Sequence, residues 1–225
     1  MLITPFKLSK SKVTLFLLPL FIFSLSLFFA PFYYDGDSIP YNKIYDSFLV
    51  SNANLFDGFS IYKDKVNGSL IHYLYIWIVT NLGIERGFSM AFANSILAYL
   101  MMRLFLQWRV PIYIALVIIL TNYYVLGLYF AAERLKFGYI FMLLGLIYST
   151  KPKLSIVFAL TSILAHAQQV LVYASVLFSS VMANILYSLK TAKLSRKSAY
   201  SLISLAFIAL IFLYFIVFLK NYSMS

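Results

Sequence analysis

The sequence predicts an all-α, polytopic helical transmembrane bundle, and two observations carry that prediction. Hydrophobic residues make up 63% of the 225 residues, well above the roughly one half that is typical of soluble domains. They also form blocks that approach the ~20 residues needed to cross a ~30 Å hydrocarbon core. These blocks lack the alternation of a barrel strand, and lipid leaves the backbone to satisfy its own hydrogen bonds, so helices are expected. The clearest blocks are residues 13–32, 88–106, 112–130 and 199–219.

The charge pattern indicates membrane topology rather than a nucleic-acid partner. The chain carries 18 Lys and Arg residues against 7 Asp and Glu residues, a formal net charge of +11. Lys7, Lys10 and Lys12 precede the first apolar block, and further basic residues fill the short connection 190–197. Because basic residues collect in short cytoplasmic loops of membrane proteins, no nucleic acid is expected. The absence of cysteine excludes a disulfide framework and a cysteine-based metal site.

The first two segments follow from the charges that flank them. Residues 13–32 are predicted to be the first span, retained as a signal anchor, with the lysine-rich amino terminus in the cytoplasm. Residues 33–67 hold five of the seven acidic residues and are predicted to be a polar external segment. The tyrosines interleaved with these acidic residues are typical of the membrane–water interface.

The remaining spans are predicted within residues 68–219, so that residues 1–225 form a single integral membrane domain. The stretch 154–189 is too long for one ordinary span and is expected to fold as two helices that meet near residues 166–169. About seven or eight spans result, with room for re-entrant segments. The other spans are expected at 69–82, 88–106, 112–130, 135–148 and 199–219.

Two topologies stay open at this point. If the stretch 154–189 crosses once, Arg134 lies on the cytoplasmic side. If it forms a hairpin and residues 33–83 make an even number of crossings, then Arg134 and His166 share an external face with the acidic segment. The second topology places more of the basic residues in the cytoplasm, and the charge bias therefore favours it.

Three charged residues interrupt an apolar stretch in "YFAAERLKFGYIF", residues 129–141. Glu133 is expected to pair with Lys136, three residues on, which leaves Arg134 without a local partner. An intramembrane cation marks a functional site, and guanidinium suits a lipid phosphate; the alternative is an arginine that extends to the headgroups from a helix end. Small residues on the face of Arg134 predict the close approach of another helix. That face continues through Gly138, Phe141 and Gly145.

A second group of polar residues lies in "SILAHAQQVLVY", residues 162–173. If the helix continues through this segment, Ser162, His166, Gln169 and Tyr173 share one face. Imidazole is the side chain best suited to proton transfer near neutral pH. The alternative is a histidine that only bonds a neighbouring helix. His72, at the start of a predicted span, is interpreted as interfacial.

The third group is acidic and lies in "YYDGDSIPYNKIYDSF", residues 33–48. Asp35 and Asp37 follow the first span directly and could bind sugar hydroxyls or act as a base; solvated loop carboxylates are the alternative. Neither the histidines nor the acidic residues have metal-site spacing, so no metal is expected. No phosphate-cradling glycine loop or dinucleotide fingerprint occurs, so no cofactor is expected.

Together these segments resemble the Wzy-type polysaccharide polymerases, in particular the EpsG-like branch. The shared order is an external Asp- and Tyr-containing segment, then "ERLKFGYIFMLLGLIY", a lysine-bearing turn, and "IVFALTSILAHAQQVLVY". By this resemblance Arg134 holds the arginine position of the family and His166 its histidine position. The chain has Leu-Lys-Phe-Gly after Arg134 where Gln-Gly-Leu-Ala is common in the family, and Ala-His-Ala-Gln where Phe-His-x-Ser is common.

The resemblance implies a metal-independent glycosyltransferase in the bacterial inner membrane, at its outer face. Such an enzyme polymerises oligosaccharide repeat units carried on undecaprenyl pyrophosphate into O-antigen, capsule or exopolysaccharide. Arg134, with Lys136 or Arg86, would neutralise the pyrophosphate, and His166 or an aspartate such as Asp35 or Asp37 would accept a proton. Gln169 and Tyr173 would contact the substrate.

The implied partners are the lipid-linked oligosaccharide, membrane lipids and other proteins of polysaccharide export and assembly. Two other functions stay open: a glycolipid transporter or flippase, and a non-catalytic membrane subunit of a polysaccharide assembly complex.

Overall fold

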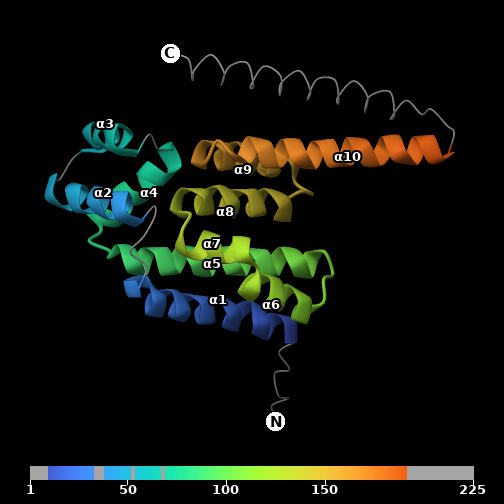
Figure 1. Cartoon of the computed structure of the whole chain (residues 1–225), viewed down its shortest axis with the longest axis horizontal. Coiled ribbons are helices and arrows are strands. Elements are labelled where there is room, and N and C mark those ends of the chain that lie inside the picture. The colour runs from blue at the N-terminus through green and yellow to red at the C-terminus, as the bar shows by residue number, and fades with distance from the viewer. Residues whose placement is uncertain (1–9, 33–37, 52–53, 67–68, 192–225) are drawn as a thin grey trace, which may run out of the picture. The chain divides into compact units, whose positions relative to one another are not determined.

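The structure, a computed structural model, describes residues 10–32, 38–51, 54–66 and 69–191. Every regular element within these ranges is helical, which confirms the predicted all-α class (Figure 1). The chain separates into two compact units, Met1–Ala167 and Gln168–Ser225, and α10 is the helix described in the second. The elements are α1 (Lys10–Phe29), η1 (Ala30–Phe32), α2 (Ser38–Ser51), α3 (Leu55–Val66), α4 (Leu70–Asn81), α5 (Arg86–Gln107), α6 (Ile112–Thr121), α7 (Tyr123–Phe130), α8 (Glu133–Ile147), α9 (Pro152–Ala165) and α10 (Gln169–Thr191).

Two of the described helical stretches are long and apolar enough to cross a membrane, Ser11–Phe32 and Arg86–Gln107. The pair α6 and α7 adds a third candidate if its two helices, bent by 55°, count as one span. Helices α4 and α9 are apolar but shorter than a span. Breaks near residues 122, 131–132 and 149–151 divide the apolar sequence from residue 112 to residue 165 into the short helices α6, α7, α8 and α9. The predicted seven or eight spans are therefore not confirmed. The expected span at 199–219 lies outside the described residues.

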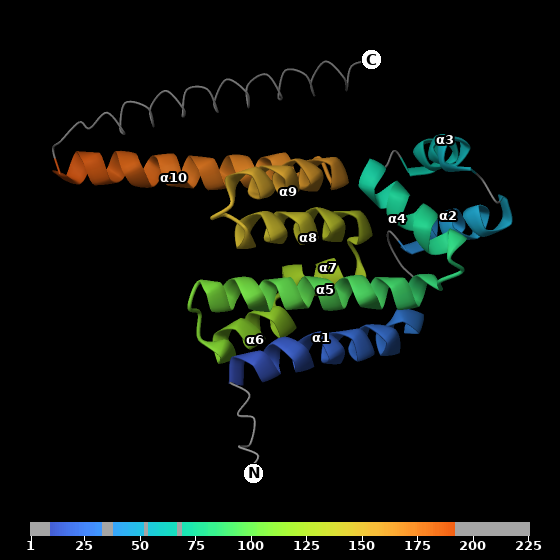
Figure 2. The same ribbon diagram turned by 180° about the vertical axis from the view of Figure 1, so that it is seen from behind.

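In the first unit α1 and α5 pack side by side and run antiparallel, as both views of the chain show (Figures 1 and 2). Asn94 of α5 donates from Nδ2 to the Oγ of Ser26 of α1 over 3.0 Å, which ties the end of one helix to the first half of the other. Helix α8 packs on the opposite side of α5, and α9 covers α8. The last turn of α1 and the first turn of α5 therefore lie at the same end of the first unit.

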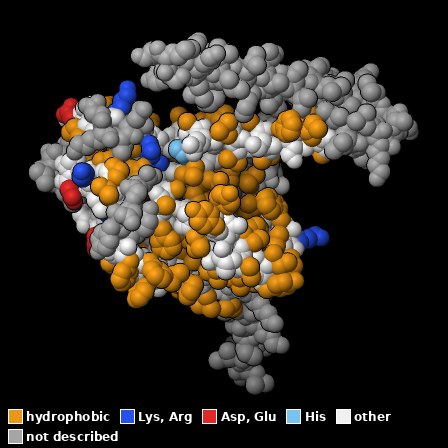
Figure 3. All heavy atoms as spheres, viewed as in Figure 1, with side chains coloured by type: hydrophobic (Ala, Val, Ile, Leu, Met, Phe, Trp, Pro, Cys, Tyr) orange, Lys and Arg blue, Asp and Glu red, His pale blue; other side chains and the backbone are white. Residues whose placement is uncertain are grey.

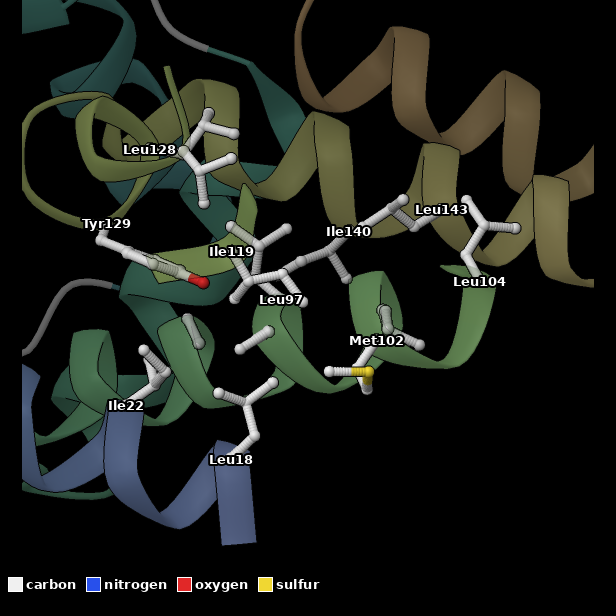
Figure 4. Close-up of a cluster of buried hydrophobic side chains, with 14 of the residues drawn as sticks. Leu18, Ile22, Leu97, Met102, Leu104, Ile119, Leu128, Tyr129, Ile140 and Leu143 are labelled. Carbon is white, nitrogen blue, oxygen red and sulfur yellow. The ribbon is translucent and has the colours of Figure 1, made fainter. Parts of the chain in front are cut away.

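Buried aliphatic side chains hold these helices together (Figure 4). Leu18 and Ile22 of α1 lie one helical turn apart and face Leu97 of α5, while Ile140 and Leu143 of α8 approach from the other side. Hydrophobic side chains also cover the outer surface of these helices, whereas charged side chains gather over α2 and α3 (Figure 3). Phe16 is 68% exposed and Phe28 65% exposed. An apolar surface of this kind suits lipid rather than water.

The close approach predicted for the Gly145 face is confirmed. Helix α9 passes so near that a Cβ at Gly145 would lie 3.4 Å from the backbone oxygen of Ser155. The Oγ of Ser155 donates to the carbonyl of Gly145 over 2.9 Å. The small residue therefore admits another helix, as expected of small residues at membrane helix interfaces.

The predicted break in the stretch 154–189 is also confirmed, because α9 ends at Ala165 and α10 begins at Gln169. His166 is the C-cap of α9, with extended backbone angles of φ −158° and ψ 115°. The helix therefore does not continue through His166, and the polar face expected from Ser162 to Tyr173 does not form.

The segment predicted to be polar and external contains two helices, α2 and α3, that fold against α4. Their contact is an aromatic core of its own, in which Tyr41, Tyr62 and Tyr73 are each at most 1% exposed. The acidic and tyrosine-rich composition of this segment thus conceals an amphipathic pattern whose buried face is aromatic. Asp46 and Asp57 stay exposed on the other face.

Candidate functional site

A pocket of about 500 Å³ opens where the end of α1, the start of α5 and the start of α8 meet. Its apolar lining residues, called the apolar wall, come mainly from α1, η1, α5 and α7. Its polar lining residues, called the polar wall, come mainly from α2, α5, α8 and the residue before α5. The apolar wall includes Leu27, Ala30, Phe88 and Phe130, and the polar wall includes Asn42, Asp46, Glu85, Arg86 and Glu133.

Glu133 is the centre of the polar wall. Its Oε1 accepts hydrogen bonds from the hydroxyl of Tyr45 at 3.2 Å and from Nε2 of His72 at 3.0 Å. Its Oε2 accepts from Nε of Arg86 at 3.2 Å and from Nη2 at 2.7 Å. The side chain is 4% exposed. A carboxylate has about four acceptor positions, so these donors satisfy Glu133 fully and make it a poor proton acceptor.

The local structure explains why these side chains converge. His72 lies on the buried face of α4 together with Ile76 and Val79, four and seven residues on, which is helical spacing. Glu133 and Arg86 are the first residues of α8 and α5. The first turn of a helix favours a carboxylate, because its free N–H groups carry partial positive charge.

Arg86 connects the buried network to the pocket. Its Nη1 donates to the Oδ1 of Asn42 over 2.7 Å, and its guanidinium carbon lies 5.7 Å from the ring centroid of Tyr45. The bonds to Asn42 and Glu133 use three of its five N–H groups. The side chain is 24% exposed, and its other two N–H groups make no hydrogen bond within the described residues. That Arg86 contacts substrate stays a prediction.

Beyond Glu133 the hydrogen bonds continue into the aromatic core. The hydroxyl of Tyr62 lies 2.6 Å from Nδ1 of His72, and both side chains are fully buried. Burial raises the pKa of the Tyr62 hydroxyl, a contribution that Tyr41 increases and Arg134 partly opposes. Burial and the nearby Glu133 carboxylate likewise raise the pKa of Tyr45. Both hydroxyls therefore stay protonated and can donate hydrogen bonds at neutral pH.

The predicted pair between Glu133 and Lys136 is wrong. The ammonium of Lys136 donates to the backbone oxygen of Tyr129 over 3.1 Å and lies 3.8 Å from the sulfur of Met90. Glu133 binds Arg86 and His72 instead, because α5 and α4 bring these donors within 3.2 Å of its carboxylate. Lys136 lines the pocket but is only 2% exposed.

Arg134 lies away from the pocket wall. Its guanidinium carbon is 6.0 Å from the ring centroid of Tyr41, so it contacts the aromatic core of α2 to α4. Glu133 and Arg134 are adjacent in the sequence and point in different directions from the same helix, as expected for neighbours about 100° apart.

Of the other predicted residues in the first unit, His166 does not line the pocket. His166 ends α9, and Gln169 and Tyr173 lie on α10 in the second unit. Asp35 and Asp37 lie outside the described residues. Within the described ranges, no group of three His, Asp or Glu side chains could hold a metal ion.

Sequence reasoning missed the roles of His72, Tyr45, Tyr62 and Asn42. His72 was interpreted as interfacial, yet it is 0% exposed. The spacing of His72 with Ile76 and Val79 was the available signal, because a histidine on the apolar face of a short helix must find a buried partner.

The chain matches no protein-family model, no curated protein and no solved structure.

Proposed function

We propose that this protein is a membrane glycosyltransferase that extends a lipid-linked oligosaccharide, with the pocket beside Arg86 as its active site. The observation that carries the proposal is a pocket lined by both apolar and charged side chains at the ends of two candidate spans. Ala30 is near the end of Ser11–Phe32, and Arg86 begins Arg86–Gln107. A pocket between those ends lies where a span leaves the hydrocarbon, which is the depth of a lipid headgroup.

The polar wall suits the junction between a sugar and a phosphate. Arg86 offers two N–H groups, and guanidinium binds phosphate oxygens as a fork. Asp46 and Glu85 are exposed carboxylates that line the same pocket, and carboxylates accept hydrogen bonds from sugar hydroxyls. The apolar wall from α1 and α5 suits the first carbons of a prenyl or acyl chain.

The reaction follows from these groups. The hydroxyl oxygen of the acceptor unit attacks the anomeric carbon of the growing glycan while the bond from that carbon to the pyrophosphate oxygen breaks. The electron pair stays on the pyrophosphate, where Arg86 stabilises the charge that develops. The acceptor's proton passes to Asp46 or Glu85, because Glu133 already accepts four hydrogen bonds.

The finer features of the proposal come from the sequence. They are a bundle of seven or eight spans in a bacterial inner membrane, undecaprenyl pyrophosphate as the carrier, and a surface polysaccharide as the product. The cytoplasmic amino terminus expected from its lysines directs the pocket to the outer face. The roles that the resemblance implies for Arg134 and His166 stay predictions. Neither residue lines this pocket, and the reaction proposed here uses Arg86 and either Asp46 or Glu85 instead.

The test is glycan extension by the purified protein in nanodiscs. The substrate is undecaprenyl pyrophosphate-linked oligosaccharide extracted from cells that lack the protein, and the product is separated on a gel. The wild-type protein should lengthen the glycan and Arg86→Ala should abolish the extension, since one positioned donor to developing charge contributes about 100-fold or more. Arg103→Ala, nearly five turns along α5 from Arg86 and beside the ring of Tyr148, should extend normally.

Other results would contradict the proposal. Normal extension by Arg86→Ala would remove this pocket from the mechanism. Movement of the unaltered glycolipid between leaflets, without extension, would support transport instead. Arg134→Ala belongs in the same series: loss of extension there with a normal Arg86→Ala would place the active site where the family resemblance puts it.

A further inference from the structure

A chain of hydrogen bonds runs from the pocket into the aromatic core. Four side chains from four helices form it: Tyr62 of α3 and His72 of α4, which do not line the pocket, and Glu133 of α8 and Arg86 of α5, which do. The successive distances are 2.6 Å, 3.0 Å and 2.7 Å. Only Arg86, at the end of this chain, reaches the pocket with a substantially exposed side chain.

The hydrogen positions in this chain follow from the chemistry of its members. An ionised carboxylate only accepts hydrogen bonds, so the ring nitrogen of His72 that faces Glu133, Nε2, must carry a proton. Arg86 holds Glu133 in its ionised form through two N–H groups. In the neutral ring Nδ1 is then an acceptor, and the protonated hydroxyl of Tyr62 donates to it.

We propose that His72 is a positioning residue for Arg86, fixed as the neutral Nε2–H tautomer by Tyr62 and Glu133. His72 and Tyr45 hold Oε1 of Glu133, which orients the carboxylate plane, and Oε2 in turn orients the guanidinium. Without His72 the carboxylate can rotate toward its remaining donors, and the guanidinium of Arg86 loses its direction at the pocket. The inference deepens the proposed function and rests on it where activity is concerned.

The burial of His72 indicates that its side chain does more than fill space. His72 is 0% exposed and its ring contacts Tyr41 edge-on, with centroids 5.0 Å apart. A leucine would fill most of this volume without the cost of burying polar atoms. The structure keeps imidazole there with both nitrogens bonded, an arrangement whose consequence at the pocket is the direction of Arg86.

The first experiment reads the tautomer directly. The chain has two histidines, so His166→Gln leaves a single imidazole to observe by ¹⁵N NMR after histidine labelling in nanodiscs. We expect a protonated Nε2 and an unprotonated Nδ1 whose resonance moves in Tyr62→Phe. Tyr73→Phe is the matched control, because that hydroxyl donates to the carbonyl of Leu55. A proton on Nδ1 in either charge state, or an unmoved Nδ1 resonance in Tyr62→Phe, would overturn the proposal.

The second experiment reads the consequence at Arg86 through glycan extension. His72→Leu should lower kcat/KM at least about tenfold, the usual effect of losing a hydrogen bond to a charged group. His72→Gln carries an amide N–H of similar reach and should stay within about threefold of the wild type. Equal losses in the two variants, or no loss in a folded His72→Leu protein, would overturn the positioning role.

Two further measurements keep the outcomes separate. If His72→Leu does not fold, Tyr62→Phe takes its place, since it removes one oxygen and should lower kcat/KM about threefold; an unchanged kcat/KM there would overturn the role. If the wild-type protein extends no glycan, the proposed function fails, and the NMR result alone then decides whether His72 has the assigned tautomer and partners.

Discussion

Glu133 shows how much a single buried carboxylate can organise. Its two oxygens accept from Tyr45, His72 and Arg86, which come from α2, α4 and α5. Burial of an ion is costly unless it is paired and fully hydrogen-bonded, and here both conditions hold. The charge of Glu133 therefore stabilises the fold only in company with its partners.

Replacing Glu133 by glutamine tests this dependence. Glu133→Gln keeps the shape but removes the charge that balances Arg86, and it introduces N–H groups that face the donor of His72. Because removal of one partner leaves the other buried and unpaired, we expect a loss of about 3 kcal/mol in the free energy of unfolding. Denaturant titration in detergent micelles measures it.

The control is Glu85→Gln in the same pocket. Glu85 is exposed, so its replacement should change the free energy of unfolding by less than about 0.5 kcal/mol. Equal losses in the two variants would show that the hydrogen bonds at Glu133 have no special weight.

At the scale of elements, two helical glycines differ in how closely other side chains approach them. Gly58 of α3 faces the aromatic core: a Cβ there would lie 2.7 Å from the ring of Phe48 and 2.8 Å from the hydroxyl of Tyr73. Gly127 of α7 is the opposite case, because an added Cβ would meet nothing within 4 Å. Asn122 starts α7 by accepting a bond from the backbone N–H of Tyr124 at 3.0 Å.

A pair of alanine substitutions follows from this contrast. Gly58→Ala should lower the free energy of unfolding by about 1–3 kcal/mol, because buried rings must move to admit the methyl group. Gly127→Ala should raise it by up to about 1 kcal/mol, because alanine is the better helix former. Thermal unfolding of the two variants beside the wild type gives both signs, and a gain for Gly58→Ala would contradict the packing around α3.

At this scale the sequence predicted the features that depend on residues close together in the chain. Apolar blocks specified helices, and the length of the stretch 154–189 specified a break near residues 166–169. The partners of Glu133, by contrast, lie 47, 61 and 88 residues away in the chain. The local rule of helical spacing selected Lys136 for Glu133, and only the packing of α4 and α5 on α8 brings the observed donors close. The predicted number of spans is not confirmed for a related reason, since apolar composition does not reveal where short helices end.

For the whole molecule, the two candidate spans predict which residues lie on each side of the membrane. Helices α1 and α5 are antiparallel, so Lys12 and Gln107 lie at one end of the pair and Phe32 and Glu85 at the other. All four positions are exposed. If the spans cross the bilayer with the amino terminus in the cytoplasm, these two pairs are separated by the membrane.

Single cysteines test the sidedness, and the cysteine-free chain needs no background substitutions. We expect a membrane-impermeant maleimide to label Phe32→Cys and Glu85→Cys in intact cells. Lys12→Cys and Gln107→Cys should react only after the membrane is permeabilised. Labelling of Lys12→Cys and Glu85→Cys from the same side would contradict the transmembrane arrangement and the placement of the pocket at the outer face.

The sharing of one carboxylate among three helices has an evolutionary consequence. A substitution of Glu133 alone would leave the His72 imidazole and the Arg86 guanidinium without their shared acceptor. A tolerated substitution there therefore requires simultaneous changes at positions 72 and 86. Descendants of a common ancestor should accordingly inherit or lose the glutamate, the histidine and the arginine as a set, and such covariation would be visible in their genes without any knowledge of the substrate.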